Sequence, residues 1–242
     1  MKKVDIIVPC YNEEEMIDLF YQETSKIISG IDGYEFRFIF VDDGSRDKTY
    51  EKLFALAERH TDVKFLSFSK NFGKEAAMYA GLVYTEGDYV IIMDADLQHP
   101  PACIPEIIRR FEDGYEVINM VRTKNESAGW FKNMASSAFY KLINALSDVK
   151  FESNASDFFA ISSRVADVLR TNYREKTRFL RGYVQSVGFR KTTLEYTAAE
   201  RAGGASHYTL KKLMNFAIST IVGFSDFPLK LGLYAGAVSF LA

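Results

Sequence analysis

The sequence predicts an α/β protein built on a Rossmann-like, doubly wound and mostly parallel sheet. Short runs rich in Val, Ile and Phe alternate with segments of helical apolar spacing through the first 121 residues, and such alternation favours parallel strands joined by helices. Three of the four runs end in polar or acidic residues, where sheets of this kind bind their ligands. With 242 residues, 48% of them hydrophobic, the chain can bury a sizeable core.

The predicted elements of this first half follow in regular order. The strands are residues 4–8, 35–41, 63–68 and 88–93, and the helices are residues 13–29, 47–60, 74–84 and 104–112. Asp47 and Pro101 are suited to helix starts, while Gly30 and Gly114 are suited to helix ends. Parallel strands joined in this way would bring their carboxyl ends to one edge of the sheet.

From Arg122 onward the alternation becomes irregular. Helices are predicted at residues 128–146, 163–172 and 177–186, and extended segments at 156–161 and 189–195. No stretch rich in Pro, Gly or Ser separates them from the first half. We therefore expect a single domain over residues 1–208 with an elaborated C-terminal half.

The end of the chain has a different pattern. Over residues 209–228, apolar residues recur at helical spacing behind Lys211 and Lys212, which fits equally an amphipathic helix on a membrane surface and a helix packed on the core. Residues 231–242 carry no charge, but a bilayer span needs about 20 apolar residues. Residues 229–242 are either a buried helix or the start of a truncated transmembrane segment, and we favour the second. At the other end, residues 1–5 do not resemble a signal peptide.

The net charge of −2 conceals an uneven distribution. Residues 1–121 carry 13 Lys and Arg against 23 Asp and Glu, whereas residues 122–242 carry 17 against 9. An acidic half suits metal ions and nucleotide hydroxyl groups, and a basic half suits phosphate or an anionic membrane surface. The basic residues follow no recognisable nucleic-acid-binding motif, so we expect no nucleic acid partner. Two cysteines and three scattered histidines exclude a disulfide scaffold and a zinc cluster.

Glycine-rich phosphate loops are missing from the sequence. It has neither Gly-x-Gly-x-x-Gly after a strand nor a P-loop, which argues against a dinucleotide oxidoreductase and a P-loop enzyme. A bound diphosphate would then need another counter-charge, and a divalent metal is the obvious candidate. Asp94 and Asp96 follow an apolar strand, and strand alternation would turn both to one side, about 6–7 Å apart. Gln98 would add a third oxygen ligand.

Several segments together match a known pattern. They are residues 7–14 (Ile-Val-Pro-Cys-Tyr-Asn-Glu-Glu), 41–45 (Val-Asp-Asp-Gly-Ser), 71–75 (Asn-Phe-Gly-Lys-Glu), 94–98 (Asp-Ala-Asp-Leu-Gln), 178–182 and 201–208. With them the chain resembles the family-2 inverting glycosyltransferases of the GT-A fold. The resemblance is strongest to the polyprenyl-phosphate branch, which comprises the dolichol-phosphate mannose synthases and the bacterial undecaprenyl-phosphate glycosyltransferases, and it covers nearly the whole chain.

The resemblance implies a nucleotide-sugar site along the strand ends. The residues it assigns to the nucleotide sugar are Pro9, Tyr11, Glu13, Asp42, Asp43, Lys74 and Asp94, with Asp43 near the base. It assigns Mg²⁺ or Mn²⁺ to Asp94, Asp96 and Gln98, where a cation would stabilise the diphosphate as a leaving group. The residues expected to act in catalysis are Asp94, Asp96, Arg122 and Asp157.

The same resemblance implies a lipid-phosphate acceptor in the basic half. The matching residues are Arg122, Lys132, Ser136 and Arg201. Arg suits phosphate because its planar fork forms bidentate bonds. A phosphate monoester, with a second pKa near 6, is already nucleophilic at neutral pH, so no general base is needed. The loop at Asp157 departs from the family pattern because it lacks an arginine and a second aspartate, which leaves Asp157 as a sugar-contacting or supporting group.

Taken together, these features predict metal-dependent transfer of a hexose, with inversion, from a nucleotide sugar (UDP-sugar favoured) to a polyprenyl phosphate. The enzyme would serve cell-envelope glycan assembly on the cytoplasmic face of the bacterial inner membrane, anchored at its C-terminus, and a homo-oligomer stays open. The main alternative is the same fold acting on a soluble, protein or polysaccharide acceptor. A sugar nucleotidyltransferase would need a glycine-rich loop near residues 9–12, where none exists. A non-catalytic nucleotide-sugar-binding scaffold is the remaining alternative.

Overall fold

The computed structural model describes residues 1–123, 155–173 and 179–198, together with residues 230, 232, 233, 236, 239 and 240. Contacts along the chain divide it into two units. The first comprises Met1–Thr123 and Asn154–Gly204, and the second Lys124–Ser153 and Ala205–Ala242. The strands and the numbered helices described below belong to the first unit.

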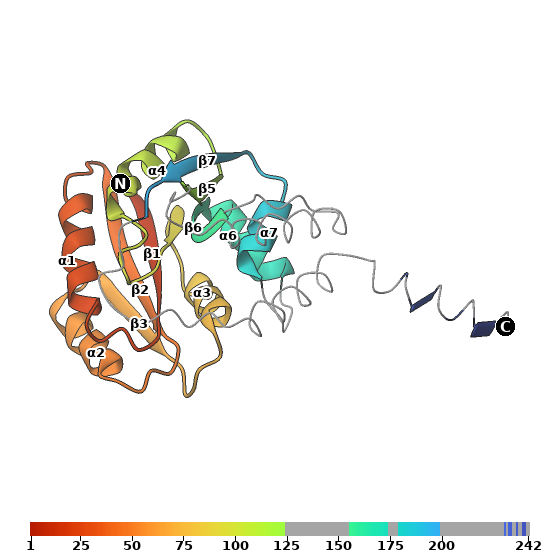
Figure 1. The fold of residues 1–242 in the computed structure, drawn as a ribbon. Helices are drawn as coiled ribbons and strands as arrows, with labels where there is room; N and C mark the ends of the chain where they lie inside the picture. Colours follow the sequence, from red (N-terminus) through yellow and green to blue (C-terminus); the bar gives the residue numbers. More distant parts are fainter. Residues whose placement is uncertain are drawn as a thin grey trace. The chain divides into compact units, whose positions relative to one another are not determined.

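A seven-stranded sheet runs through the first unit in the order β3-β2-β1-β4-β6-β5-β7 (Figure 1). Its strands are β1 (Lys2–Cys10), β2 (Tyr34–Asp42), β3 (Val63–Ser67), β4 (Tyr89–Ile92), β5 (Val117–Arg122), β6 (Ala155–Ser162) and β7 (Lys191–Tyr196). Neighbouring strands pair in parallel except at β6, which is antiparallel to both β4 and β5. The predicted mostly parallel, doubly wound sheet is therefore confirmed.

Helices cover both faces of this sheet. One face carries α1 (Ile17–Ile28), α2 (Thr49–Arg59) and α4 (Ile104–Glu112), which a short 3-10 turn (Pro101–Cys103) precedes; the other carries α3 (Lys74–Val83), α6 (Ser163–Asn172) and α7 (Leu180–Ser186) (Figure 1). Phe20 of α1 packs with Phe38 and Phe40 of β2 in the larger core. These contacts follow from the apolar spacing on α1 and the alternation along β2.

Helix α3 lies unusually close to the sheet. A Cβ atom at Gly81 would stand 2.5 Å from Cγ2 of Ile7 in β1, so a side chain at this position would push the helix outward. Ala77 of the same helix packs against Ile39 and Val41. This close packing fixes the direction of α3, whose first residue, Lys74, lies at the carboxyl edge of the sheet.

The elements predicted from sequence agree with the observed ones to within a few residues at most ends. The strand β5 was not predicted, because the buried Asn119 interrupts its apolar run. The predicted helix 177–186 begins only at Leu180, because the backbone of Phe179 is not helical, and residues 177 and 178 lie outside the described residues. The predicted helices 128–146 and 209–228 lie outside the described residues, as does most of segment 229–242. Among the described residues, no helix has the length and apolar character to cross a membrane.

Candidate active site

Sheet topology gathers the predicted site residues at one edge. The strands β1, β2, β4 and β5 run the same way, so their carboxyl ends share that edge, and the antiparallel β6 begins there. In the ladder between β4 and β6, Ile92 stands opposite Phe159. Asp94 lies two residues past the end of β4 and Asp157 lies two residues before Phe159 in β6, so both come to the same edge although 63 positions of sequence separate them. The antiparallel strand therefore carries Asp157 to the predicted metal site.

Lys74 joins these two carboxylates. Its Nζ lies 2.7 Å from Oδ1 of Asp94 and 2.8 Å from Oδ2 of Asp157. Burial alone would lower the pKa of Lys74, but the two facing carboxylates outweigh it and raise the pKa above its usual value. Lys74 thus stays charged and neutralises the centre of the acidic edge, next to the position at which the sequence predicted a metal ion.

Arg181 reaches the same carboxylate from α7. Its Nη1 lies 3.4 Å from Oδ1 of Asp157, and side-chain exposures of 16% and 19% leave the pair little solvent screening. Burial would raise the pKa of Asp157, but Lys74 and Arg181 more than offset that effect and hold the pKa well below its usual value. Asp157 is therefore an anion held between two cations. Arg181 is not among the predicted site residues, although it lies in the matching segment 178–182.

The predicted metal residues lie in a turn rather than on a strand. Because β4 ends at Ile92, strand alternation does not set the directions of Asp94 and Asp96, and that part of the sequence argument is wrong. Leu97 has a positive φ of 59°, and the backbone N–H of Gln98 donates to Oδ1 of Asp96 at 3.1 Å. The turn, not the pleat, orients this acidic pair.

The donor set fits a hard divalent cation. Two carboxylates and one amide oxygen are suited to Mg²⁺ or Mn²⁺ when phosphate oxygens and water complete the shell. Within the described part of the chain, no three acidic, histidine or cysteine side chains gather in a ready-made metal site. Asp94, Asp96 and Gln98 would hold such a cation beside the phosphate oxygens of a bound substrate.

The buried His99 holds the start of this turn in place. Its Nδ1 accepts a hydrogen bond from the backbone N–H of Asp94 at 2.9 Å, and its ring stacks on Phe158 with centroids 5.0 Å apart. Burial lowers the pKa of His99, which favours the neutral ring that this acceptor role needs. His99 is not among the predicted site residues, and its position three residues after Asp96 is the one sequence signal that points to it.

Asp42 and Asp43, predicted to hold the nucleotide, brace neighbouring loops. The carboxylate of Asp42 accepts from the N–H of Ser45 and the hydroxyl of Ser67 at 2.9 and 2.8 Å. The carboxylate of Asp43 accepts from the N–H groups of Phe72 and Gly73 at 2.7 and 2.9 Å. Burial raises the pKa of Asp43, although those two N–H groups oppose the shift. Both aspartates thus hold the loops that surround the predicted base site.

The remaining predicted donor residues flank this braced region. Pro9 lies within β1, Tyr11 is 37% exposed just after it, and the N–H of Glu13 donates to Oγ1 of Thr49 at 2.8 Å. Asp47 accepts from the N–H of Thr49 at 3.0 Å, but α2 begins at Thr49, two residues after the predicted start at Asp47. These contacts fix the segment between β1 and α1 against the start of α2.

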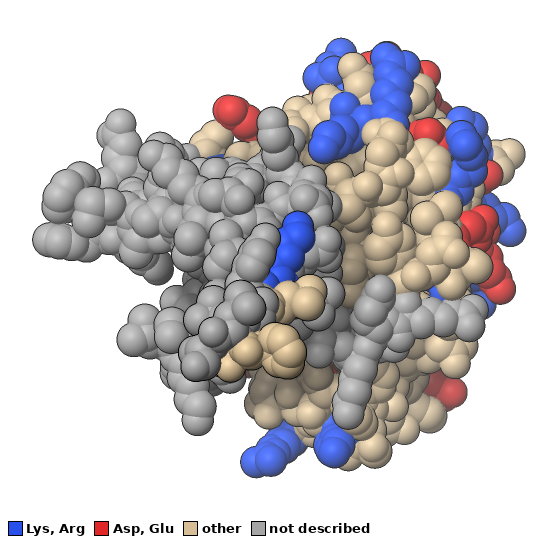
Figure 2. Space-filling view, turned by 90° about the vertical axis from the view of Figure 1, so that its right-hand side faces the viewer, with Lys and Arg blue, Asp and Glu red and all other residues tan. Residues whose placement is uncertain are grey.

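Of the predicted acceptor residues, Arg122 alone is described. It ends β5 at the same edge as Asp94, is exposed, and stands opposite Tyr196 of β7. Lys132, Ser136 and Arg201 lie outside the described residues. On the face in Figure 2, described lysines and arginines gather at the top, others lie at the right and bottom margins, and one lies in the middle of the view.

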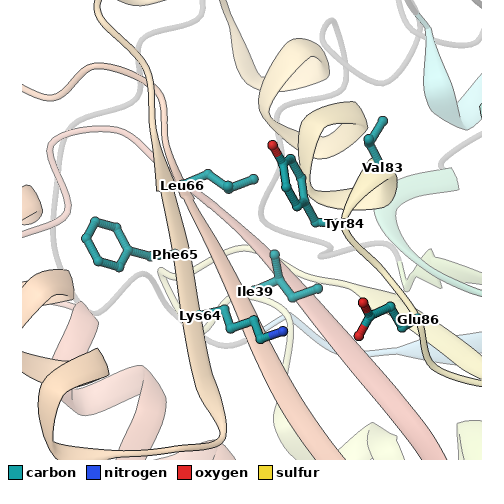
Figure 3. Close-up of a pocket in the computed structure, with 7 residues that line it drawn as sticks. All are labelled: Ile39, Lys64, Phe65, Leu66, Val83, Tyr84 and Glu86. Carbon is teal, nitrogen blue, oxygen red and sulfur yellow. The ribbon is translucent and has the colours of Figure 1, made fainter.

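A cavity of about 380 Å³ lies elsewhere, between β2, β3 and the end of α3 farther from Lys74. Figure 3 shows Leu66, Val83 and Tyr84 around it, whereas Phe65 points to the other side of β3. Of the described residues, none predicted for the nucleotide sugar, the metal or the lipid phosphate lines this cavity. The candidate active site is therefore the carboxyl edge of the sheet rather than this pocket.

Open α/β sheets bind their ligands at the carboxyl ends of the strands, which is where the acidic turns and the paired cations of this chain lie. Residues 5–170 match the family model described as glycosyl transferase family 2. The chain belongs to this family and is a glycosyltransferase, as its sequence motifs predicted.

Curated relatives align with almost the entire chain. An uncharacterised glycosyltransferase, YkcC, of Bacillus subtilis is 38% identical over 96% of this chain and 71% of its own length. The bactoprenol glucosyl transferase of Shigella phage SfX is 37% identical over 99% of this chain and 79% of its own length.

Solved structures confirm the GT-A fold. A mannosyltransferase from Pyrobaculum calidifontis, in complex with GDP-Man and Mn²⁺, superposes with a TM-score of 0.58 at 20% identity over 85% of this chain and 59% of its own. Glucosyl-3-phosphoglycerate synthase from Mycobacterium tuberculosis, in complex with Mn²⁺, UDP-glucose and phosphoglyceric acid, gives 0.60 at 17% identity over 92% and 79%. At these identities the likeness concerns the fold alone.

Proposed function

We propose that the enzyme transfers a hexose, with inversion, from a nucleotide sugar to the phosphate of a polyprenyl phosphate. The observation that carries the proposal is the meeting of Asp94, Asp157 and Lys74 at the carboxyl edge, in a chain that is 37% identical to bactoprenol glucosyl transferases over 99% of its length. A UDP-sugar is the favoured donor.

On the donor side, Asp94, Asp96 and Gln98 would hold Mg²⁺ or Mn²⁺ beside the diphosphate. The ion would offset the charge that develops on the departing diphosphate. Lys74 is the described cation nearest to that position, bonded to Asp94 at 2.7 Å, and it would turn toward the diphosphate when a metal ion takes its place on Asp94. Asp157, kept ionised by Lys74 and Arg181, would accept hydrogen bonds from the hydroxyl groups of the sugar. Pro9, Tyr11, Glu13 and the braced Asp42 and Asp43 would line the nucleotide.

On the acceptor side, a phosphate oxygen attacks the anomeric carbon while that carbon's bond to the diphosphate breaks. The acceptor phosphate is already anionic near neutral pH, so the site has to bind and orient it rather than remove a proton. Arg122, exposed at the end of β5, would bind it together with Lys132, Ser136 and Arg201.

We further propose that residues 209–228 lie on the membrane surface and that 229–242 begin a transmembrane anchor. The lipid acceptor and the paired Lys211 and Lys212 support this arrangement, with the catalytic residues on the cytoplasmic face of a bacterial inner membrane. Wild-type protein should co-sediment with anionic liposomes in a salt-sensitive way, and Lys211→Glu/Lys212→Glu should weaken this. No co-sedimentation of either protein at low salt would favour a buried helix.

A transfer assay tests the acceptor assignment. Purified enzyme is incubated with UDP- or GDP-sugars, a short polyprenyl phosphate and Mn²⁺, and the lipid-linked sugar is measured. Arg122→Ala should raise the KM for polyprenyl phosphate or lower kcat by about ten- to a hundredfold, because a charge-assisted phosphate contact contributes about 1.5–3 kcal/mol. The KM for the nucleotide sugar should stay within about twofold.

Arg190→Ala is the matched control. Arg190 is also exposed and lies just before β7, but its Nη1 donates to the carbonyl of Asp113 at the opposite edge of the sheet. Weakened nucleotide-sugar binding in Arg122→Ala would place Arg122 on the donor side. Transfer to phosphoglyceric acid, protein or polysaccharide, without transfer to the lipid, would favour a soluble-acceptor enzyme instead.

A further inference from the structure

Glu75, the neighbour of Lys74 in the first turn of α3, has no part in the function argued above. Its Oε2 accepts a hydrogen bond from the backbone N–H of Leu180 at 2.8 Å, across 105 residues of sequence. Leu180 is the first residue of α7, and Phe179 before it offers no side-chain cap. A helix leaves its first N–H groups without acceptors inside the helix. Glu75 therefore supplies, from another helix, the acceptor that a capping residue usually provides.

The residue after Leu180 is Arg181. Its guanidinium lies 3.4 Å from Asp157 and 5.3 Å from the ring of Phe179. The Glu75 contact thus holds the backbone directly before an arginine that touches the candidate active site. A shift of about an ångström at the start of α7 would carry Arg181 out of ion-pair distance.

The charges around Glu75 suit this role. Burial raises its pKa to about 7, and Asp157 adds to the shift, whereas the N–H of Leu180, Arg181 and Lys74 oppose it. The charged groups that face it are Asp157 on β6, Arg181 on α7 and Lys74 on α3. A carboxyl group keeps a free acceptor oxygen in either protonation state, so the contact with Leu180 survives near neutral pH.

We propose that Glu75 is a positioning residue that caps α7 from α3 and thereby holds Arg181 against Asp157. Two neighbouring residues in the first turn of α3 then act on Asp157 in different ways. Lys74 contacts its carboxylate directly, and Glu75 holds Arg181, the second cation that contacts it. Asp157 keeps a set direction only while both are in place.

Amide exchange tests the contact without any assay of activity. In Glu75→Leu, which keeps the bulk but removes the acceptor, the amides of Leu180–Ser186 should exchange about tenfold faster, while those of β1 stay unchanged. Glu75→Gln keeps an acceptor oxygen, so in this variant the same amides of α7 should exchange at rates within about threefold of those in wild type. Glu51→Leu, at an exposed first-turn glutamate of α2, is the matched control and should leave α7 unchanged.

If Glu75→Leu does not fold, Glu75→Asp takes its place. That side chain is one methylene shorter and cannot span the present distance, so exchange in α7 should again rise. Unchanged exchange in α7 in the folded Leu or Asp variant would overturn the proposal.

A kinetic experiment, which rests on the proposed function, tests whether Glu75 affects sugar transfer through Arg181. Glu75→Leu should lower kcat about tenfold with the KM for the nucleotide sugar within about twofold, and Glu75→Gln should recover most of it. If Glu75 acts through Arg181, Glu75→Leu combined with Arg181→Met should be no slower than Arg181→Met alone. If the double variant is slower than Arg181→Met alone, the two effects are independent and the proposal for Glu75 is contradicted. If the wild-type enzyme transfers no sugar to polyprenyl phosphate, the proposed function is contradicted, and the amide-exchange result alone decides the proposal for Glu75.

Discussion

The two sides of the carboxyl edge stabilise their aspartates by different means. Beside β2, Asp42 and Asp43 accept hydrogen bonds from backbone N–H groups and a serine hydroxyl, no more than 30 residues away in sequence. Between β4 and β6, Asp94 and Asp157 are bonded to the side chain of Lys74, which stands 83 residues from Asp157.

This difference between backbone and side-chain partners indicates different roles for the two sides of the edge. A backbone N–H has a fixed place, so Asp42 and Asp43 keep their loops in one conformation. A lysine at the end of a flexible chain is exchangeable, and a divalent ion or a diphosphate can compete for the same partners. We therefore expect the β2 side to contribute mainly stability and the β4–β6 side to contribute mainly to catalysis.

The largest expected effect is that of Asp96→Asn. The amide still accepts the hydrogen bond from Gln98, so the turn should survive, but a metal ligand loses its charge. We expect kcat to fall at least about hundredfold, with a melting temperature within a few degrees of wild type. The transfer assay and a thermal melt measure the two quantities. Retention of more than a tenth of the activity, or full wild-type activity in excess EDTA, would contradict the metal assignment.

Lys74→Met tests whether the central cation is replaceable. Asp94 and Asp157 would then face each other without their shared partner; since Lys74 is 36% exposed, we expect a loss of only about 1–3 kcal/mol in the free energy of unfolding. Mn²⁺ should restore part of that loss in urea titrations. Lys70→Met, which removes an exposed lysine 5.1 Å from the ring of Phe72, is the control and should change stability by less than about 0.5 kcal/mol. Equal unfolding midpoints for both variants, with or without Mn²⁺, would refute the comparison.

Glu75→Gln should change how stability depends on pH. The folded pKa of Glu75, about 7, lies above the usual 4.5, so the folded state binds the extra proton between these values. Wild type should therefore be most stable relative to Glu75→Gln below pH 4.5 and lose about 3 kcal/mol of that advantage as pH rises through 7. Urea titrations of both proteins across this range measure it. Since every other group titrates in both proteins, parallel curves would show that the Glu75 carboxyl is not held neutral by its surroundings.

Ser67→Ala should give the smallest effect. It removes one of the hydrogen bonds to Asp42, of 2.8 Å, and should lower the free energy of unfolding by about 1 kcal/mol without any response to Mn²⁺. Calorimetric melts with and without the ion test this. If Mn²⁺ stabilises Ser67→Ala as much as it stabilises Lys74→Met, the aspartates beside β2 respond to the ion as well, and the comparison between the two sides of the edge is wrong.

Much of the parallel half was predictable from sequence because its signals are local. Strand β2 and helix α2 were predicted close to their observed bounds, since a period of two or of 3.6 residues needs only neighbouring side chains. The acidic ends of β2 and β4 were likewise recognisable, because their carboxylates follow apolar runs directly. Strand β5 escaped prediction because Asn119 breaks its pattern, and its burial depends on the strands beside it.

The sequence by itself determined the fold class, the family and the acidic residues of the active edge, because each depends on the periodicity or the motifs of successive local segments. Only the tertiary structure decided which other groups of the chain those residues contact. The antiparallel insertion of β6 brought Asp157 to Asp94, the packing of α3 brought Lys74 to both, and the start of α7 brought Arg181 to Asp157 and Leu180 to Glu75. Such partners lie 20 to 105 residues apart, and no local period can specify an ion pair that depends on strand order, register and the angle at which a helix leaves the sheet.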